Sequence, residues 1–151
     1  MNTTVEELKA VFNLLHDGSI TDASALDDGL LLTIDCAYLA ALVHREFTSF
    51  HIRLTGLEYF AFHPWADPDS QKISVTDVAD LVSSELEILS ADHDGDTVAV
   101  ACKAWNSPLF KGGELFIRCK KIELNMQNGE PLSLESLVKY SKRYWDAFGG
   151  K

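Results

Sequence analysis

The sequence predicts an α+β fold: a mainly antiparallel β-sheet, connected as a meander, with an N-terminal and a C-terminal helix packed on it. Apolar residues recur at helical spacing at both ends of the chain. Between Leu30 and Met126 they alternate with polar residues at a period of two, and short turn sequences separate the strands. The 151 residues fit a single domain covering 1–151.

The first helix is expected over residues 5–15. Thr4 and Glu7 form a capping box at its start, where the threonine hydroxyl and the glutamate carboxylate satisfy free backbone N–H groups. Gly18 follows the last apolar residue of the helix and is expected to adopt the left-handed conformation that ends it.

Strands are then predicted at residues 19–25, 30–36, 50–54 and 57–62. A turn at Asp27-Asp28-Gly29 joins the first two, a single helical turn is expected at 38–43, and Gly56 marks a bulge or bend. Pro64 and Pro68 are expected to end the fourth strand and make 63–70 a loop, since proline cannot donate to a sheet ladder.

In the second half, a short helix capped by Ser74 is expected over 74–82. Strands at 85–91 and 97–105 form a hairpin around Asp92-His93-Asp94-Gly95-Asp96, because Asp-Gly favours tight turns. A strand over 114–126 changes its apolar parity near Lys120-Lys121, which predicts a bulge there. Ser133 caps the last helix, whose apolar face carries Leu134, Leu137, Val138, Ser141, Tyr144, Trp145 and Phe148.

Charge excludes the simplest polyanion-binding functions. The chain has 13 basic and 23 acidic residues, a net charge of −10, which disfavours nucleic acid and anionic membrane as partners. Residues 1–100 hold 18 of the acidic and 4 of the basic residues. The alternatives are a mixed solvated surface, if the sheet interleaves the two parts, and an acidic face that steers a basic protein partner.

Neither targeting nor membrane segments are evident. The N-terminus lacks a basic region followed by an apolar one, and no uninterrupted apolar stretch is long enough to span a bilayer. Cys36, Cys102 and Cys119 contain no C-x-x-C pair and are interpreted as core thiols. These features favour a cytoplasmic protein.

Two short motifs suggest metal chemistry and are better explained as turns. Adjacent His16 and Asp17 are typical of metal-dependent phosphohydrolases, but those enzymes need further ligands from an all-helical domain. Asp92-x-Asp94-x-Asp96 starts like a calcium loop, yet Thr97 and Lys103 stand where an EF-hand needs Gly and Glu. No nucleophile or phosphate-binding motif occurs, so we predict no metal or cofactor and disfavour an enzyme.

Large aromatic residues occupy two segments where turns are usually polar. They follow the strand that ends near Phe62 and the strand that ends at Trp105, and they either close the core or form a contact patch or pocket. The candidate binding residues are Trp65, Trp105, Phe110, His63, His51, Tyr38 and Tyr59.

The opening of the chain resembles a group of small bacterial proteins. An amphipathic helix followed by Leu15-His16-Asp17-Gly18-Ser19-Ile20 is similar to uncharacterised proteins that begin with an aromatic residue or Leu before His-Asp-Gly-x-Ile, and to some immunity proteins of bacterial toxin systems. The resemblance covers about the first fifth of the chain and implies a bacterial, cytosolic, stand-alone domain. It carries over no catalytic residue.

Three hypotheses follow. The first is a non-enzymatic, possibly immunity-like interaction domain whose acidic surface binds a basic protein through Trp65 or Trp105. The second is a small-molecule binder or enzyme with a pocket between sheet and helices, lined by Tyr38, Tyr59, Trp65 and Trp105, with His51 or His63 as the polar group. The third is a structural subunit of a homodimer.

Overall fold

A computed structural model describes residues 4–65, 77–107 and 111–149, and it confirms the α+β class with an antiparallel sheet and a helix near each end. The predicted helical turn after the second strand is a helix of two turns. The elements in chain order are α1 (Thr4–Leu14), β1 (Ser19–Leu26), β2 (Gly29–Asp35), α2 (Ala37–Val43), β3 (Ser49–Thr55), β4 (Tyr59–Pro64), α3 (Val78–Ser83), β5 (Leu86–Asp94), β6 (Thr97–Ala104), β7 (Gly112–Arg118), β8 (Lys121–Met126) and α4 (Leu134–Gly149).

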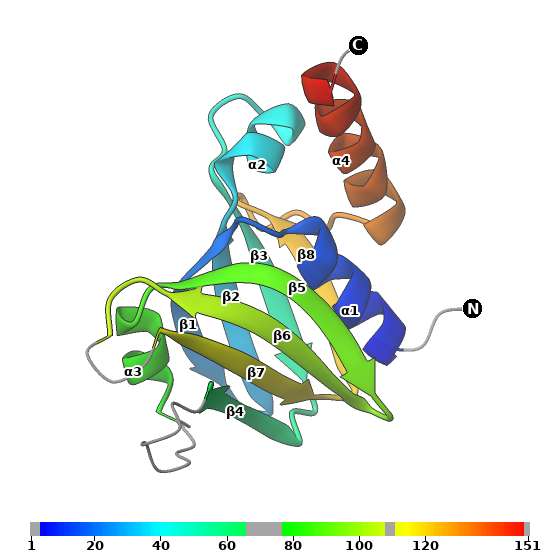
Figure 1. Cartoon of the computed structure of the whole chain (residues 1–151). Coiled ribbons are helices and arrows are strands. Elements are labelled where there is room, and N and C mark those ends of the chain that lie inside the picture. The colour runs from blue at the N-terminus through cyan, green and yellow to red at the C-terminus, as the bar shows by residue number, and fades with distance from the viewer. Residues whose placement is uncertain (1–3, 66–76, 108–110, 150–151) are drawn as a thin grey trace.

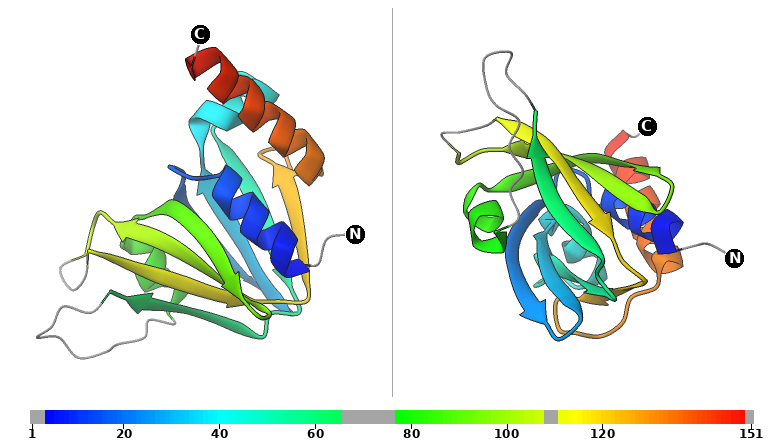
Figure 2. Two further views of the ribbon diagram at one scale, coloured as in Figure 1. Left: turned by 45° about the vertical axis from the view of Figure 1, so that its right-hand side comes forward. Right: turned by 90° about the horizontal axis from the view of Figure 1, so that it is seen from below.

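The eight strands form one sharply bent sheet in the order β4-β7-β6-β5-β1-β2-β3-β8 (Figures 1 and 2). Only two residue pairs, Ser19 with Glu87 and Ile20 with Leu86, join β1 to β5 at the bend. The bend divides the sheet into two halves, one made of β4, β7, β6 and β5 and the other of β1, β2, β3 and β8. The connections β3–β4 and β7–β8 each run from one half to the other. Glu58 N–H donates to the Arg118 carbonyl, and Lys120 N–H donates to the Thr55 carbonyl, so these connections lie together at one end of the molecule.

The core lies inside the bend. The predicted alternation places Leu32 and Ile34 of β2 and Ile52 of β3 fully inside, where they meet inward-facing residues of β6 and β7. Removing these side chains from water is the main stabilising contribution to the fold. One hydrophobic cluster therefore joins the two halves of the sheet.

Helix α1 covers the side of the bend between β5 and β8 (Figures 1 and 2). It buries Leu8, Val11 and Phe12 in the core. The Asn13 side chain bonds to the part of the β5 edge that β1 does not pair: its Nδ2 donates to the Ala91 carbonyl at 2.9 Å, and its Oδ1 accepts from the Ala91 N–H at 2.8 Å. Among the described helices, none has the length and apolar character needed to cross a membrane.

The ends of α1 differ from the prediction. Thr4, expected as the N-cap, is already helical, and its hydroxyl donates to the Lys120 carbonyl. Asp17 rather than Gly18 takes the left-handed conformation, with φ 69°. Gly18 serves close packing instead, because a Cβ there would lie 2.8 Å from the Leu15 carbonyl oxygen.

The predicted strand over 114–126 is two strands, so the bulge near Lys120-Lys121 was wrong. β7 pairs with β4 and β6, whereas β8 pairs with β3 at the other end of the strand order. The change of apolar parity therefore marks a break at Cys119 and Lys120, where the chain passes from one half of the sheet to the other.

The prediction that proline ends the fourth strand at Phe62 was also wrong. β4 continues through His63 to Pro64, which pairs with Gly113. Since Trp65 N–H donates to the Gly112 carbonyl, the backbone nitrogen of Pro64 faces away from β7. β4 is an end strand, so Pro64 lacks a donor only on the side where no strand pairs.

Smaller differences concern caps and turns. Asp77 caps α3 by accepting from the Ala79 N–H, and Ser74, the expected cap, lies outside the described residues. The β5–β6 hairpin has a shorter loop than expected, since both strands extend to Asp94 and Thr97.

On α4, Ser133 caps the helix as predicted, since its Oγ accepts from the Ser136 N–H. Leu137 and Ser141 are buried, but Val138 and Trp145 of the predicted apolar face are exposed. The reason is that α4 contacts α1 and α2 rather than lying flat on the sheet. The Phe148 side chain lies outside the described part.

Candidate protein-docking face

The four strands β4, β7, β6 and β5 present a broad surface on the side opposite the core, which we call the outer face. Strand register places the outward residues in rows: Tyr59 beside Arg118, Ala61 beside Phe116, and His63 beside Glu114. The rows continue onto β6 and β5, where Phe116 is followed by Ala99 and Asp92. Within the described ranges, no helix lies across this face (Figures 1 and 2).

Two tryptophans stand at one end of the outer face. Trp105 is 60% exposed and Trp65 is 50% exposed. Trp65 lies directly over the backbone of Gly112, because a Cβ added to that glycine would be 2.5 Å from the indole ring. A larger residue at position 112 would displace this ring.

Two charged side chains, Glu87 and Lys103, orient Trp105. Its Nε1–H donates to the Glu87 carboxylate at 2.6 Å, and the Lys103 ammonium lies 3.8 Å from the ring centroid. Lys103 pairs in the sheet with both Gly112 and Glu87, so the two tryptophans flank one row of the face. The hydrogen bond and the cation–π contact reduce the freedom of the exposed ring, which lowers the entropic cost of using it in binding.

The opposite end of the outer face is acidic. Asp92, Asp94 and Glu114 surround a shallow depression of about 440 Å³ whose lining also includes Phe116. A hydrogen bond from the His93 N–H, with the Lys9 ammonium 3.4 Å away, lowers the pKa of Asp92. Carboxylates beside an aromatic ring suit the guanidinium or ammonium group of an arginine or lysine side chain.

Tyr59 and His63 are brought together on β4, at one side of the acidic depression. The Tyr59 hydroxyl and His63 Nε2 are 3.0 Å apart, and the His63 ring meets Phe116 edge-on at 4.9 Å. The two residues are four apart in one strand, so they share its outer face. This spacing was a usable signal in the sequence.

The remaining candidates lie elsewhere. His51 is on β3, in the other half of the sheet, with its Nδ1 3.2 Å from the Thr33 hydroxyl. Tyr38 lies on α2, where its hydroxyl donates to the His16 carbonyl and its ring contacts Tyr144 of α4. Phe110 is outside the described residues. The structure therefore does not gather Tyr38 or His51 with Tyr59, Trp65 and Trp105 around one pocket.

His16 and Asp17 belong to a structural corner between α1, α2 and α4. The His16 ring stacks on Trp145 with centroids 5.4 Å apart, and its Nδ1 is 3.3 Å from the Asp17 carboxylate. Asp17 N–H donates to the Ile88 carbonyl. In the described residues, no three His, Cys, Asp or Glu side chains are grouped to hold a metal ion.

Several groups near the core are held in their neutral forms. Burial raises the pKa of the Cys36 thiol to about 11 and that of Cys102 to about 12. Burial also raises the pKa of Cys119 and of the Tyr38 phenol. A thiol acts as a nucleophile only when ionised, so the raised pKa values disfavour a nucleophilic role for these cysteines.

Alkaline pH is expected to destabilise the fold through these thiols. Cys102 stays neutral up to pH about 12 when folded but ionises near pH 9 when unfolded, so its stabilising contribution is complete below pH 9 and is lost as pH rises toward 12. Above pH 9, each such thiol lowers the free energy of unfolding by up to about 1.4 kcal/mol per pH unit. Urea unfolding at pH 8, 9 and 10 measures it, and Cys102→Val should reduce the slope. An unchanged slope in that variant would contradict the assignment.

Comparison of the chain with protein-family models, with curated proteins and with solved structures finds no match.

Proposed function

We propose that the protein is a non-enzymatic interaction domain that binds a basic partner protein through the outer face. The observation that carries this proposal is that exposed Trp65 and Trp105 share one sheet face, which none of the described helices crosses, with a carboxylate-lined depression. Tryptophan and tyrosine supply most of the binding energy in many protein interfaces, and complementary charge raises the association rate. The net charge of −10 favours a basic partner over an acidic one.

The charge layout supports a local acidic site rather than an acidic half of the molecule. Basic residues are concentrated in 101–151, and this part supplies β7 and β8, which lie in different halves of the sheet. The two parts of the chain are thus interleaved. Asp92, Asp94 and Glu114 nevertheless line one depression, with the Lys9 ammonium beside Asp92 and the Arg118 guanidinium donating to Thr97, which also lines it.

The proposed setting is the bacterial cytoplasm, and the proposed role is immunity-like. Cys36, Cys102 and Cys119 are free thiols, as expected in a reducing compartment. The opening Leu15-His16-Asp17-Gly18-Ser19-Ile20 supports the bacterial, immunity-like part of the proposal. An immunity protein acts by binding its target, which agrees with a docking face rather than a catalytic centre.

Charge removal on the outer face tests the proposal. The immobilised protein is used to capture partners from a lysate of the organism that encodes it, with elution by salt. Asp92→Asn, Asp94→Asn and Glu114→Gln combined should weaken retention of a basic partner by about tenfold at low salt. The matched control combines Asp22→Asn, Asp27→Asn and Asp28→Asn, which removes the same charge from exposed positions elsewhere. Equal retention by both triple variants would overturn the proposal.

The tryptophans should contribute more to affinity than any single carboxylate. Trp65→Ala and Trp105→Ala are each expected to cost about 2 kcal/mol in binding the captured partner, about a 30-fold weaker Kd. Isothermal titration calorimetry measures this effect. Trp145→Ala is the control, since Trp145 is 38% exposed but lies on α4, away from the outer face. If the control loses as much affinity as the other two variants, the outer face is not the docking surface.

A further inference from the structure

The outer face contains a trough that runs along β6. The outward residues on its floor, Thr97, Ala99 and Ala101, are small, whereas the residues between them are buried in the core. Strand register places Asp92 of β5 on one side of Ala99 and Phe116 of β7 on the other. The acidic depression of about 440 Å³ is the part of this trough that lies over Thr97 and Ala99.

The two ends of the trough differ in chemistry. At one end the three carboxylates of the acidic depression exceed their basic neighbours, the ammonium of Lys9 and the guanidinium of Arg118. At the other end Trp65 and Trp105 stand on either side of the row that contains Lys103. A basic group is therefore favoured at the first end and an apolar group at the second.

The floor of the trough offers side chains rather than backbone groups to a partner. Over residues 98–103, β6 pairs with β5 on one side and with β7 on the other. A segment that docks on this face must therefore satisfy its own backbone N–H and C=O groups, because a buried group without a partner costs free energy. An α-helix satisfies these groups internally, whereas a single extended segment does not.

The tryptophans limit the width of the occupant. Trp65 lies over Gly112 of β7, and Trp105 bonds to Glu87 of β5. These two strands are separated by β6, so they are about 10 Å apart, which is two strand spacings. A single helix has about this width, and a second sheet is broader.

We infer that the docking element of the basic partner is a single amphipathic α-helix that lies along β6. This inference rests on the proposed function of the outer face. Basic side chains of the helix enter the acidic depression, and apolar side chains pack between the two tryptophans. Ala99 and Lys103 are four residues apart in β6, about 13 Å, which corresponds to about nine residues of helix. The recognised helix therefore carries its basic and apolar residues on one face, about two and a half turns apart.

A designed helical peptide tests the inference. The probe is an acetylated and amidated peptide of about 20 residues built on alanine and glutamine. It carries two arginines near its start and leucines about nine residues later on the same face. Binding is followed by calorimetry and by NMR of the nitrogen-15-labelled protein. The peptide should shift the indole N–H signals of Trp65 and Trp105 but not that of Trp145, which lies on α4.

Two altered peptides test the helix and its spacing. Proline in place of a central alanine keeps the arginine and leucine side chains but breaks the helix, so the Kd should rise by at least about tenfold. Moving the leucines by two residues keeps the composition but turns them to the opposite face, and it should weaken binding to a similar extent. Both comparisons use the unaltered protein, so they do not depend on the folding of any variant.

Substitutions in the protein locate the binding site. Ala99→Phe fills the trough and should weaken peptide binding by about tenfold, with the fold checked by circular dichroism. Ala25→Phe is the matched control, because Ala25 is exposed on β1 in the other half of the sheet. The Asp92, Asp94 and Glu114 triple variant should also bind the peptide about tenfold more weakly at low salt.

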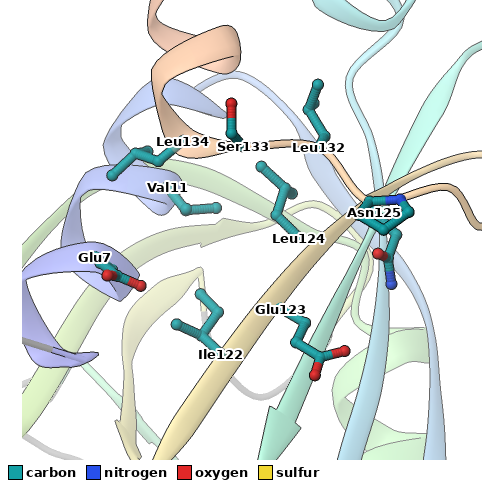
Figure 3. A pocket seen from close by; sticks show the side chains of 10 residues that line it. Glu7, Val11, Ile122, Glu123, Leu124, Asn125, Leu132, Ser133 and Leu134 are labelled. Atoms are coloured by element: carbon teal, nitrogen blue, oxygen red, sulfur yellow. The ribbon is translucent and has the colours of Figure 1, made fainter.

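The groove between α1 and β8 controls for unspecific binding of an amphipathic peptide. It also has a volume of about 440 Å³, and it is lined by Val11 and Leu124, with Glu7 on its α1 side (Figure 3). It contains neither of the two exposed tryptophans of the outer face. The amide signals of Val11 and Leu124 should therefore stay unchanged on addition of the peptide, and Glu7→Gln should leave the Kd unchanged.

Several results would overturn the inference. They are equal binding of the proline peptide, signal shifts centred on Val11, Leu124 or Trp145, an unchanged Kd for Ala99→Phe, and absence of binding at about 1 mM peptide. Failure of the outer-face proposal is recognised separately, from equal retention of the captured partner by the two triple charge variants. If the partner is retained as proposed but the helical peptide fails, the helix is the wrong docking element and the face stands.

Discussion

Gly29→Ala is expected to destabilise the protein by about 3 kcal/mol, a large part of the free energy of unfolding of a typical domain. Gly29 begins β2 and pairs with Thr55 of β3. A Cβ at this position would overlap the carbonyl oxygen of Leu54, which belongs to the backbone of β3 and cannot rotate away. Relief requires the start of β2 and the end of β3 to move apart, which breaks the pairing of Gly29 with Thr55. Urea unfolding followed by circular dichroism measures the loss.

Gly95→Ala is the matched control for that substitution. Gly95 has φ +60°, and an added Cβ would meet nothing within 4 Å. Its expected cost is about 1 kcal/mol, the cost of placing an L-residue in the left-handed region. A similar loss for both variants would show that the contact of Gly29 with β3 is less close than described.

Asn13→Ala is the second substitution with a large expected effect, about 2–4 kcal/mol. The Asn13 side chain satisfies both the N–H and the C=O of Ala91 on the edge of β5, and Ala91 is only 8% exposed. Truncation leaves two buried backbone groups without partners, each of which costs about 1–3 kcal/mol. Thermal and urea unfolding measure the effect.

Two comparisons specify the cause of the Asn13 effect. Asn13→Asp keeps the acceptor for the Ala91 N–H but places an anionic oxygen against the Ala91 carbonyl, so we expect no rescue. Lys9→Ala removes a largely exposed ion pair on the same helix and should cost at most about 1 kcal/mol. A loss for Lys9→Ala equal to that for Asn13→Ala would mean that the helix as a whole, rather than this amide, is responsible.

Local patterns predicted the elements well, because their causes are local. The alternation of apolar and polar residues in β2 and β3 indicates which side of each strand is buried, and Leu32, Ile34 and Ile52 are buried as it predicts. Ser133 caps its helix because the bond to Ser136 spans only three residues. These interactions are complete within a few residues of chain.

The errors concern partners that are distant in sequence. Whether Pro64 breaks a strand depends on which side of β4 is paired, and that is decided by β7, some fifty residues later. The break at Cys119 and Lys120 had a visible signal in the change of parity, but a bulge and a change of partner strand produce the same signal. Strand order has no local signature.

The candidate sites divide in the same way. Tyr59 and His63 could be grouped from their spacing, and Trp65 and Trp105 from their exposed positions after strands. The acidic depression could not be predicted, because it depends on the strand order β7-β6-β5, which places Glu114 across β6 from Asp92 and Asp94. The position of β8 at the end of the sheet could not be predicted either, because Ile122 resembles any other strand residue until the strand order is known.

The two crossing connections have a consequence for synthesis on the ribosome. Among the described strands, β4 pairs with β7 alone, and β8 alone occupies the second side of β3. A nascent chain ending before residue 112 therefore carries β4 without its described partner strand and β3 half paired. Such exposed edges are prone to aggregate, and contacts this distant in sequence form slowly. The chain should therefore acquire its native shape only after residues 112–126 have emerged from the ribosome, and truncated translation products should depend on chaperones for solubility.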